Sequence, residues 1–264
     1  MQTSLKTFSL DTELPAPWHT YLKGQGSLQF TGNTLQLVNT DTAAAHYTDA
    51  QIDDYQTLPR RNFLWQPPLQ MTVRARFSHP AGTLSGTAGF GFWNDPFMMT
   101  GLRWPAFPRV IWFFYSSSPS NMKLDLHTPG PGWKAGTLDA NRWPFFLLLP
   151  LAPLAVPLMN VDKLYQTFWP IGQRALHVNE ALLTVDMTQW HTYRIRWQKK
   201  AAHFEVDGKV VLQSQTSPRG PLGFVLWLDN QYMVVTPKGH FKYGLLAAPG
   251  EQWLELDRLE IKNL

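Results

Sequence analysis

The stretch WHTYRIRW at residues 190–197, followed by HFEVDGKVV at residues 203–211, decides the fold class. Its apolar and polar residues alternate with the period of two that is typical of a half-buried β-strand. Asp207 and Gly208 suit the two positive-φ positions of a type I′ hairpin turn. We therefore expect antiparallel strands with one apolar and one polar face. His191 belongs to the apolar face, which predicts a core histidine with satisfied hydrogen bonds rather than a catalytic base.

The pattern W-H-x-Y-x-I-x-W, then F-x-V-D-G-x-x-V, resembles the paired strands of concanavalin A-like jelly rolls, specifically family-16 glycoside hydrolases and their laminarin-binding relatives. The resemblance covers residues 26–264. It implies an all-β jelly-roll sandwich of two antiparallel sheets. Aromatic residues alternating with Pro and Gly turns, with 12 Trp, 16 Phe and 21 Pro, also favour a sandwich over a helical bundle.

Composition limits the other classes. A chain of 264 residues with 44% hydrophobic content is consistent with one domain, residues 1–264. The absence of cysteine excludes disulfides and thiolate metal sites. The first residues lack the apolar core of a secretory signal, which favours a cytoplasmic location. The formal net charge is +4, but no long Lys/Arg block is present, so no nucleic-acid partner is expected.

A long apolar segment interrupts the strand pattern. Residues 145–159 are all apolar and include three prolines, so they are too short and too proline-broken to cross a bilayer as a helix. We interpret residues 144–171 as an apolar, partly helical insertion folded over one end or face of the sandwich, with Asn160 capping a helix towards Trp169. It is an apolar plug, a ligand-covering lid, a homo-oligomer contact or a membrane-surface contact.

The carboxylate pair of the resembled hydrolases is missing where it is expected. In that family E-x-D-x-x-E or E-x-D-x-E follows a strand that ends in Phe-Trp. Here Phe92 and Trp93 match that ending, yet the next strand, residues 109–115, has no carboxylate. A match to the motif occurs at residues 255–260, ELDRLE, which we interpret as a bulged closing strand rather than a catalytic one.

Two apolar strands end in the same way. Each has a tryptophan followed two residues later by an aspartate, Trp93 with Asp95 and Trp227 with Asp229, and residues two apart share a strand face. If both strands belong to the concave sheet, their aromatic and acidic groups line one groove. The predicted ligand-binding residues are Trp93, Asn94, Trp112, Trp227, Asn230 and Tyr232. The alternative is that Asp and Asn only turn the chain after a core tryptophan.

Three functions remain open from the sequence. The first is a ligand-binding or atypical hydrolase-like protein whose aromatic groove, covered by the insertion, takes a carbohydrate or a hydrophobic or amphipathic small molecule. The second is an enzyme in which Asp95 and Asp229 form an acid/base pair. The third is an interaction protein that uses residues 144–171. No cofactor or metal is expected; a structural calcium ion is a weaker alternative, because no dense D-x-D-x-D-G loop is present.

Overall fold

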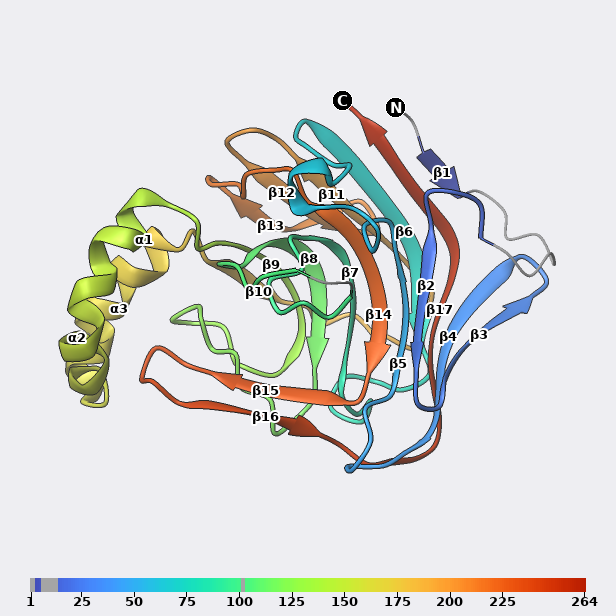
Figure 1. The fold of residues 1–264 in the computed structure, drawn as a ribbon, viewed down its shortest axis with the longest axis horizontal. Helices are drawn as coiled ribbons and strands as arrows, with labels where there is room; N and C mark the ends of the chain where they lie inside the picture. Colours follow the sequence, from blue (N-terminus) through green and yellow to red (C-terminus); the bar gives the residue numbers. More distant parts are fainter. Residues whose placement is uncertain (1–2, 6–13, 101–102) are drawn as a thin grey trace.

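The computed structural model describes residues 3–5, 14–100 and 103–264, which form a sandwich of two antiparallel sheets with a helical insertion (Figure 1). This confirms the expected all-β class. The order in the first sheet, sheet A, is β13 (Lys209–Ser214), β12 (Ala202–Val206), β11 (His191–Trp197), β6 (Leu69–Phe77), β17 (Ala248–Asn263), β4 (Thr34–Thr42) and β3 (Gly26–Thr31), with β1 (Thr3–Leu5) paired to β17. The order in sheet B is β10 (Asn179–Leu182), β9 (Gly132–Asp139), β8 (Arg109–Ser116), β7 (Thr87–Trp93), β14 (Gly223–Asp229), β5 (Asp49–Asp53) and β2 (His19–Lys23).

The hydrophobic core lies between the two sheets. The central strands contribute alternate residues to it, such as Tyr193, Ile195 and Trp197 of β11, all fully buried. From sheet B, Phe90 and Phe92 pack against them, with ring centroids 5.2 Å apart for Phe90 and Tyr193. Alternate residues of sheet B point into this core, so the residues between them form the opposite, outer face of the sheet.

The hairpin predicted from the deciding stretch is present. Strands β12 and β13 pair through Val206 and Lys209, and the turn residues Asp207 and Gly208 have φ values of 51° and 77°. The expectation for His191 was wrong in one respect. Its Nδ1 lies 2.6 Å from Asp207 Oδ2 and its side chain is 16% exposed, so its hydrogen bonds are satisfied at the sheet surface and not in the core.

Strand β17 is the last strand of the chain, as its sequence suggested, and it lies inside sheet A between β6 and β4. A register shift between Leu256 and Arg258 marks the predicted bulge. The acidic residues of the motif are all engaged with arginines on the outside of the sheet: Glu255 with Arg76, Asp257 with Arg74, and Glu260 with Arg258. The motif is therefore an ion-paired structural strand.

The insertion folds into a helical lobe made of α1 (Trp143–Leu148), the 3₁₀ turn η2 (Leu149–Leu151), α2 (Ala152–Leu158) and α3 (Asp162–Ala175). Three of its prolines, Pro144, Pro150 and Pro153, lie in the first two positions of their helices, where no intrahelical N–H bond is needed. Pro157 and Pro170 lie inside α2 and α3. The predicted helix towards Trp169 exists, but Asn160 does not cap it. Asn160 follows α2, and its Nδ2 donates to the carbonyls of Pro157 and Lys238.

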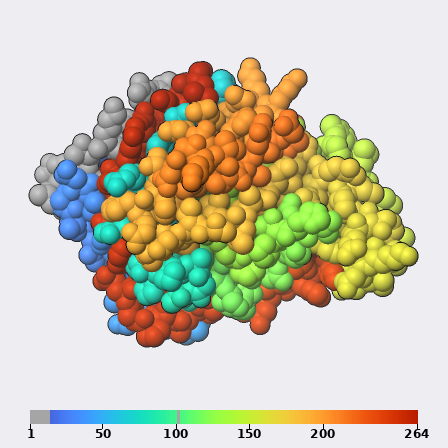
Figure 2. Space-filling model, turned by 180° about the vertical axis from the view of Figure 1, so that it is seen from behind, coloured from blue at the N-terminus to red at the C-terminus, as the bar shows by residue number. Residues whose placement is uncertain are grey.

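The helical lobe projects from one end of the sandwich (Figures 1 and 2). It is held by α3, whose Trp169 Nε1 donates to the Leu124 carbonyl at 2.7 Å and whose Gln173 accepts a hydrogen bond from the Leu126 N–H. Beside the lobe lies a hairpin of β15 (Gln231–Val235) and β16 (Phe241–Leu245), and a short 3₁₀ turn, η1 (Arg60–Asn62), lies near the end of β7. In the described parts of the chain, every helix is too short or too polar to cross a membrane. The cytoplasmic location stays a prediction.

Candidate functional site: an aromatic pocket on the outer face of sheet B

The outer face of sheet B carries a second apolar cluster, separate from the core. Sheet B is bowed, and its hollow side faces β15, β16 and the helical lobe (Figure 1). On this side Trp93 of β7, Phe114 of β8 and Trp227 of β14 are buried together, and Trp112 of β8 packs against them. Three of the predicted ligand-binding residues are thus placed on one surface, although they come from three strands.

Two glycines of β7 make room for the indole rings. Gly89 and Gly91 alternate with the core residues Phe90 and Phe92, so they face the hollow side. A Cβ atom at Gly89 would lie 2.8 Å from the Trp227 ring, and one at Gly91 would lie 2.6 Å from Trp112 Cβ. The glycine-rich sequence of β7 therefore lets side chains from both neighbouring strands lie over it.

The rings are held by one another and by hydrogen bonds. The centroid of Trp112 lies 6.2 Å from that of Trp93, 5.4 Å from that of Trp227 and 5.0 Å from that of Phe114, on which it stacks. Trp227 Nε1 donates to Thr87 Oγ1 at 2.9 Å, and Trp93 Nε1 donates to the Tyr55 hydroxyl at 2.6 Å. Both indole N–H groups are satisfied, so their orientation is fixed before any ligand binds.

A cavity of about 90 Å³ opens above these rings. Its apolar rim consists of Phe97, Met99, Met122 and Met233, of which Phe97 is 52% exposed. Polar groups gather at one side of the cavity, and these are Tyr47, Gln51, Thr87, Asp229, Gln231 and Tyr232. The pocket therefore combines flat aromatic surface with hydrogen-bonding groups, as sites for rings with polar edges require.

Asp229 is the carboxylate of this pocket. Burial raises its pKa to about 6, although Thr87 Oγ1 donates to it at 2.7 Å and the Gln231 N–H at 3.1 Å. On the neighbouring strand Asp49 lies directly opposite Asp229. Burial, and then the charge of Asp229, raise the pKa of Asp49 well above its usual range. Two opposed buried carboxyl groups favour a state in which at least one is protonated.

Asp95 lies at the other end of the hollow. Strands β7 and β14 are antiparallel, so Asp229 is opposite Thr87, whereas Trp93 is opposite Gly223. Six residues of strand separate Thr87 from Trp93, about 20 Å, and Asp95 lies beyond that end. Asp95 is fully buried, and its Oδ2 lies 2.9 Å from Arg103 Nη1. This placement contradicts the expected acid/base pair of Asp95 and Asp229, because the carboxyl groups are too far apart to act on one bond.

The two predicted asparagines hold loops. Asn94 Nδ2 donates to the Phe107 carbonyl and its Oδ1 accepts from the Arg109 N–H, at 2.9 and 2.8 Å. Asn230 accepts from the Thr48 N–H and donates to three backbone carbonyls. Both side chains are buried and neither lines the pocket, so they fit the alternative reading in which they turn the chain. Tyr232, in contrast, lines it.

Other expected contributors are located elsewhere. Strand β8, which faces the hollow with Trp112 and Phe114, has no acidic residue at any position. Among the described residues that line the pocket, none belongs to the helical lobe, so the lobe does not cover it. Within residues 3–5, 14–100 and 103–264, no group of three His, Asp or Glu side chains is arranged to hold a metal ion.

Solved structures resemble the whole sandwich. An endo-β-galactosidase from Clostridium perfringens that releases GlcNAcα1-4Gal matches with a TM-score of 0.56 and 13% identity over 98% of this chain, which spans 61% of the galactosidase chain. An endo-acting O-glycanase of the human gut microbiota matches with a TM-score of 0.53, 11% identity and coverage of 98% and 96%. A Bacillus licheniformis β-glucanase matches with a TM-score of 0.50, 11% identity and coverage of 100% and 98%.

The chain has the concanavalin A-like jelly-roll fold. At these identities the likeness establishes the fold alone. A scan of the sequence against protein-family models found no match, and a search of the curated proteins found none either. The jelly roll therefore supplies the hollow sheet, and the residues on that sheet must carry the functional argument.

Sequence reasoning missed part of the pocket. Gln51 of β5 and Thr87 of β7 line its polar side but were not among the predicted residues. Asp49, which lies opposite Asp229 without lining the cavity, was not predicted either. A signal was present, because Asp49, Gln51 and Asp53 alternate with the core residues Ala50 and Ile52. Polar residues on one face of a buried strand indicate a polar site rather than open solvent.

Proposed function

We propose that the protein binds a ligand ring that has an apolar face and a polar edge, a carbohydrate in the first instance, in the aromatic pocket of sheet B. The observation that carries this proposal is the group of Trp93, Trp112 and Trp227 on one surface, with Asp229 and Tyr232 at its side. Sugar rings stack their C–H faces on indoles and exchange hydrogen bonds with carboxylates and hydroxyls at their edges.

The size of the pocket favours a single ring or chain end. Its volume of about 90 Å³ is smaller than the roughly 300–1,000 Å³ of pockets that enclose drug-sized ligands. Three methionines and Phe97 form or border the rim, and methionine side chains adapt easily to a guest. A hydrophobic or amphipathic small molecule is the competing ligand class. Two of the structural neighbours are a β-glucanase and an endo-β-galactosidase, so β-linked saccharides are the first probes.

Replacing Trp112 by leucine tests this proposal. The substitution keeps apolar volume on β8 but removes the flat ring that contacts Trp93, Phe114 and Trp227. We expect binding of a β-linked glucose tetrasaccharide, followed by isothermal titration calorimetry, to weaken by about two- to twelvefold, since a stacking contact contributes about 0.5–1.5 kcal/mol. Trp104→Leu is the matched control, because Trp104 is 88% exposed and does not line the pocket. Equal affinities of the two variants would contradict the proposal.

Catalysis is the second candidate, now with a different pair. Asp229 and Asp49 face each other on β14 and β5, and the raised pKa of Asp229 near 6 suits a general acid. Asp229→Asn keeps the size of the side chain and separates the two functions. Loss of released reducing ends with saccharide binding retained supports an enzyme. A wild-type protein that binds the tetrasaccharide and releases no product supports the binding function.

The composition of the helical lobe favours a second function, in which its exposed apolar surface contacts a lipid bilayer. Residues 143–161 contain no charged side chain, and Trp143 and Leu147 are 78% and 69% exposed. Such an uncharged, aromatic-containing surface is typical of segments that lie in a membrane interface. We expect Leu147→Glu to reduce co-flotation with anionic vesicles about tenfold, the effect of losing one buried leucine. Leu22→Glu, at a site 43% exposed on β2, should not change it. Light scattering that shows a dimer dissociated by Leu147→Glu would instead assign this surface to self-association.

A further inference from the structure

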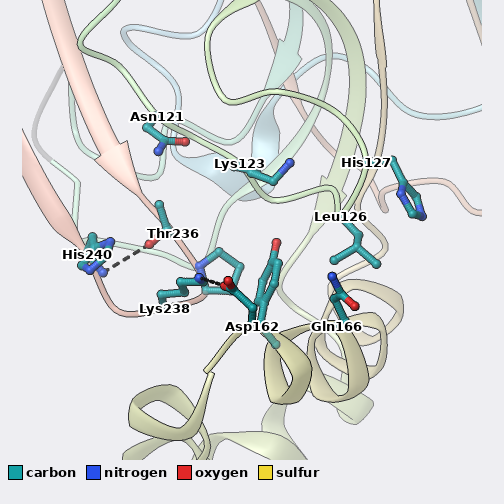
Figure 3. Close-up of a pocket in the computed structure, with 11 residues that line it drawn as sticks. Asn121, Lys123, Leu126, His127, Asp162, Gln166, Thr236, Lys238 and His240 are labelled. Atoms are coloured by element: carbon teal, nitrogen blue, oxygen red, sulfur yellow. Dashed lines mark hydrogen bonds and ion pairs between the residues drawn. The ribbon is translucent and has the colours of Figure 1, made fainter. Parts of the chain in front are cut away.

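A second and larger cavity lies at the base of the helical lobe. It has a volume of about 730 Å³ and is enclosed by the loop at residues 121–127, the first turns of α3, and the turn between β15 and β16. Figure 3 shows side chains from these three segments around the same hollow. The turn is fixed to the lobe, because Asn160 Nδ2 donates to the Lys238 carbonyl at 3.2 Å. The cavity is thus a consequence of the insertion.

Lysines outnumber carboxylates in this cavity. Lys123 and Lys238 line it together with His127 and His240, and among the described lining residues Asp162 is the one carboxylate. Lys238 Nζ lies 2.7 Å from Asp162 Oδ1, but the Asp162 side chain is 83% exposed, so this pair is weak and easily exchanged for another anion. Lys123 Nζ donates to the Thr128 carbonyl at 3.3 Å. These two ammonium groups are available to an anionic group in the cavity.

Asp125, on the same loop, does not line the cavity. Its Oδ1 accepts hydrogen bonds from the N–H groups of His127 and Thr128, at 2.8 and 2.9 Å, and its Oδ2 accepts one from Gln173 Nε2. These bonds keep the charge of the carboxylate but turn it toward the loop backbone and α3. Among the described lining residues, two lysines and one carboxylate leave a formal excess of one positive charge.

An apolar groove adjoins the cavity. It has a volume of about 520 Å³, lies between α3 and the α1–α2 segment, and has no charged residue in its lining. Thr236 and Pro237 line both the groove and the cavity, so the two spaces meet at the β15–β16 turn. A basic cavity that continues into an uncharged groove matches a molecule with an anionic head and an aliphatic tail.

We propose that this cavity and groove form one site for a single anionic amphiphile, with its head group between Lys123 and Lys238 and its alkyl chain along the groove. The inference goes beyond saccharide binding in the aromatic pocket, which lies on the other side of the wall formed by Asn121 and β15. It also differs from bilayer contact, because a monomeric amphiphile is sufficient to fill the site.

The probes are octanoate, decanoate and decyltrimethylammonium, each below the concentration at which it forms micelles, titrated into the full chain by calorimetry. We expect decanoate to bind more tightly than octanoate, by up to about fourfold for each added methylene. Decyltrimethylammonium has the same chain with a positive head, and we expect it to bind at least tenfold more weakly. Equal binding of the two head groups would overturn the proposal.

Two kinds of variant locate the site. Lys123→Met with Lys238→Met keeps the aliphatic stems and removes the charges, and we expect it to weaken decanoate binding about tenfold or more. Lys163→Met is the control, because Lys163 is exposed on α3 and does not line the cavity. Ala155→Phe fills the groove and should abolish the difference between octanoate and decanoate. Decanoate binding that survives both changes would contradict the proposal. Tetrasaccharide binding by the same variants should be unchanged, which separates this site from the aromatic pocket.

Discussion

Arg103→Ala is expected to lower the free energy of unfolding by about 3–5 kcal/mol, because it leaves a buried carboxylate without its partner. The side chains of Arg103 and Asp95 are 6% and 0% exposed, and Nη1 lies 2.9 Å from Oδ2. The same guanidinium donates to the carbonyls of Gln56 and Leu58 at 2.8 and 2.9 Å. One arginine therefore ties three loop positions together at the end of the hollow. Urea unfolding measures the loss.

The matched control is Arg219→Ala. Arg219 lies 3.6 Å from Asp139, and its side chain is 52% exposed, so its removal should cost less than about 1 kcal/mol. Arg103→Ala should also affect the aromatic pocket. Asp95 accepts a hydrogen bond from the Met99 N–H at 2.8 Å, and Met99 forms part of the pocket rim. A loss at Arg103 no larger than that at Arg219 would show that Asp95 is not dependent on this ion pair.

Asp229 is expected to make stability depend on pH. Its pKa is raised to about 6 in the folded protein, against 3.8 as the ordinary value, so the folded state holds the proton more tightly than the unfolded state. Stability from this group is full below the unfolded pKa and is lost as pH rises through about 4 to 6. A pKa that differs by about two between the folded and unfolded states corresponds to about 3 kcal/mol of unfolding free energy. As pH rises, the free energy of unfolding of the wild type should therefore fall by up to about 3 kcal/mol relative to that of Asp229→Asn.

The measurement is chemical unfolding of the wild type and Asp229→Asn from pH 4 to pH 8. The asparagine Oδ1 can still accept from the Thr87 hydroxyl and the Gln231 N–H, so the comparison isolates the charge. Asp162 supplies a control that should stay flat over this range, because Lys238 lowers its pKa and its titration therefore lies below pH 4. A constant difference between the wild type and Asp229→Asn across this range would contradict the raised pKa.

The strand pattern of the sequence predicted much of this molecule. Alternation in residues 190–197 and the Asp207–Gly208 turn predicted strands β11 to β13, which the structure contains. These inferences rest on the local period of a strand, which needs no knowledge of the partner strand. A common surface for Trp93 and Trp227 was expected only if both strands belonged to the concave sheet, and the structure pairs β7 with β14 in sheet B.

Pairing direction was the information that local pattern could not supply. Trp93 with Asp95 and Trp227 with Asp229 read alike from N- to C-terminus, but β7 and β14 run in opposite directions. Trp227 is therefore opposite Gly89, four residues along β7 from Trp93, and the Trp112 ring lies between the two indoles. The two aspartates lie beyond opposite ends of this stretch. Asp49 is the neighbour of Asp229 because β5 pairs with β14. The sequence showed the polar face of β5 but not the position of this strand in the sheet.

The insertion also combines features that its sequence predicted with a placement that its sequence did not predict. Its apolar composition and prolines predicted a segment outside the sheets, and α3 was expected near its observed position. Its placement depends on long-range hydrogen bonds, such as that of Trp169 to the Leu124 carbonyl. Those contacts hold the lobe beside the hollow rather than over the aromatic pocket.

The most direct measurement is the NMR chemical shift of the tryptophan indole N–H groups during titration with the β-linked glucose tetrasaccharide. We expect the resonances of Trp93, Trp112 and Trp227 to shift together, while those of the core residues Trp133 and Trp197 stay in place. Shifts confined to Trp143 and Trp169 of the helical lobe, or no shift at saturating saccharide, would contradict the claim that the aromatic pocket of sheet B binds this class of ligand.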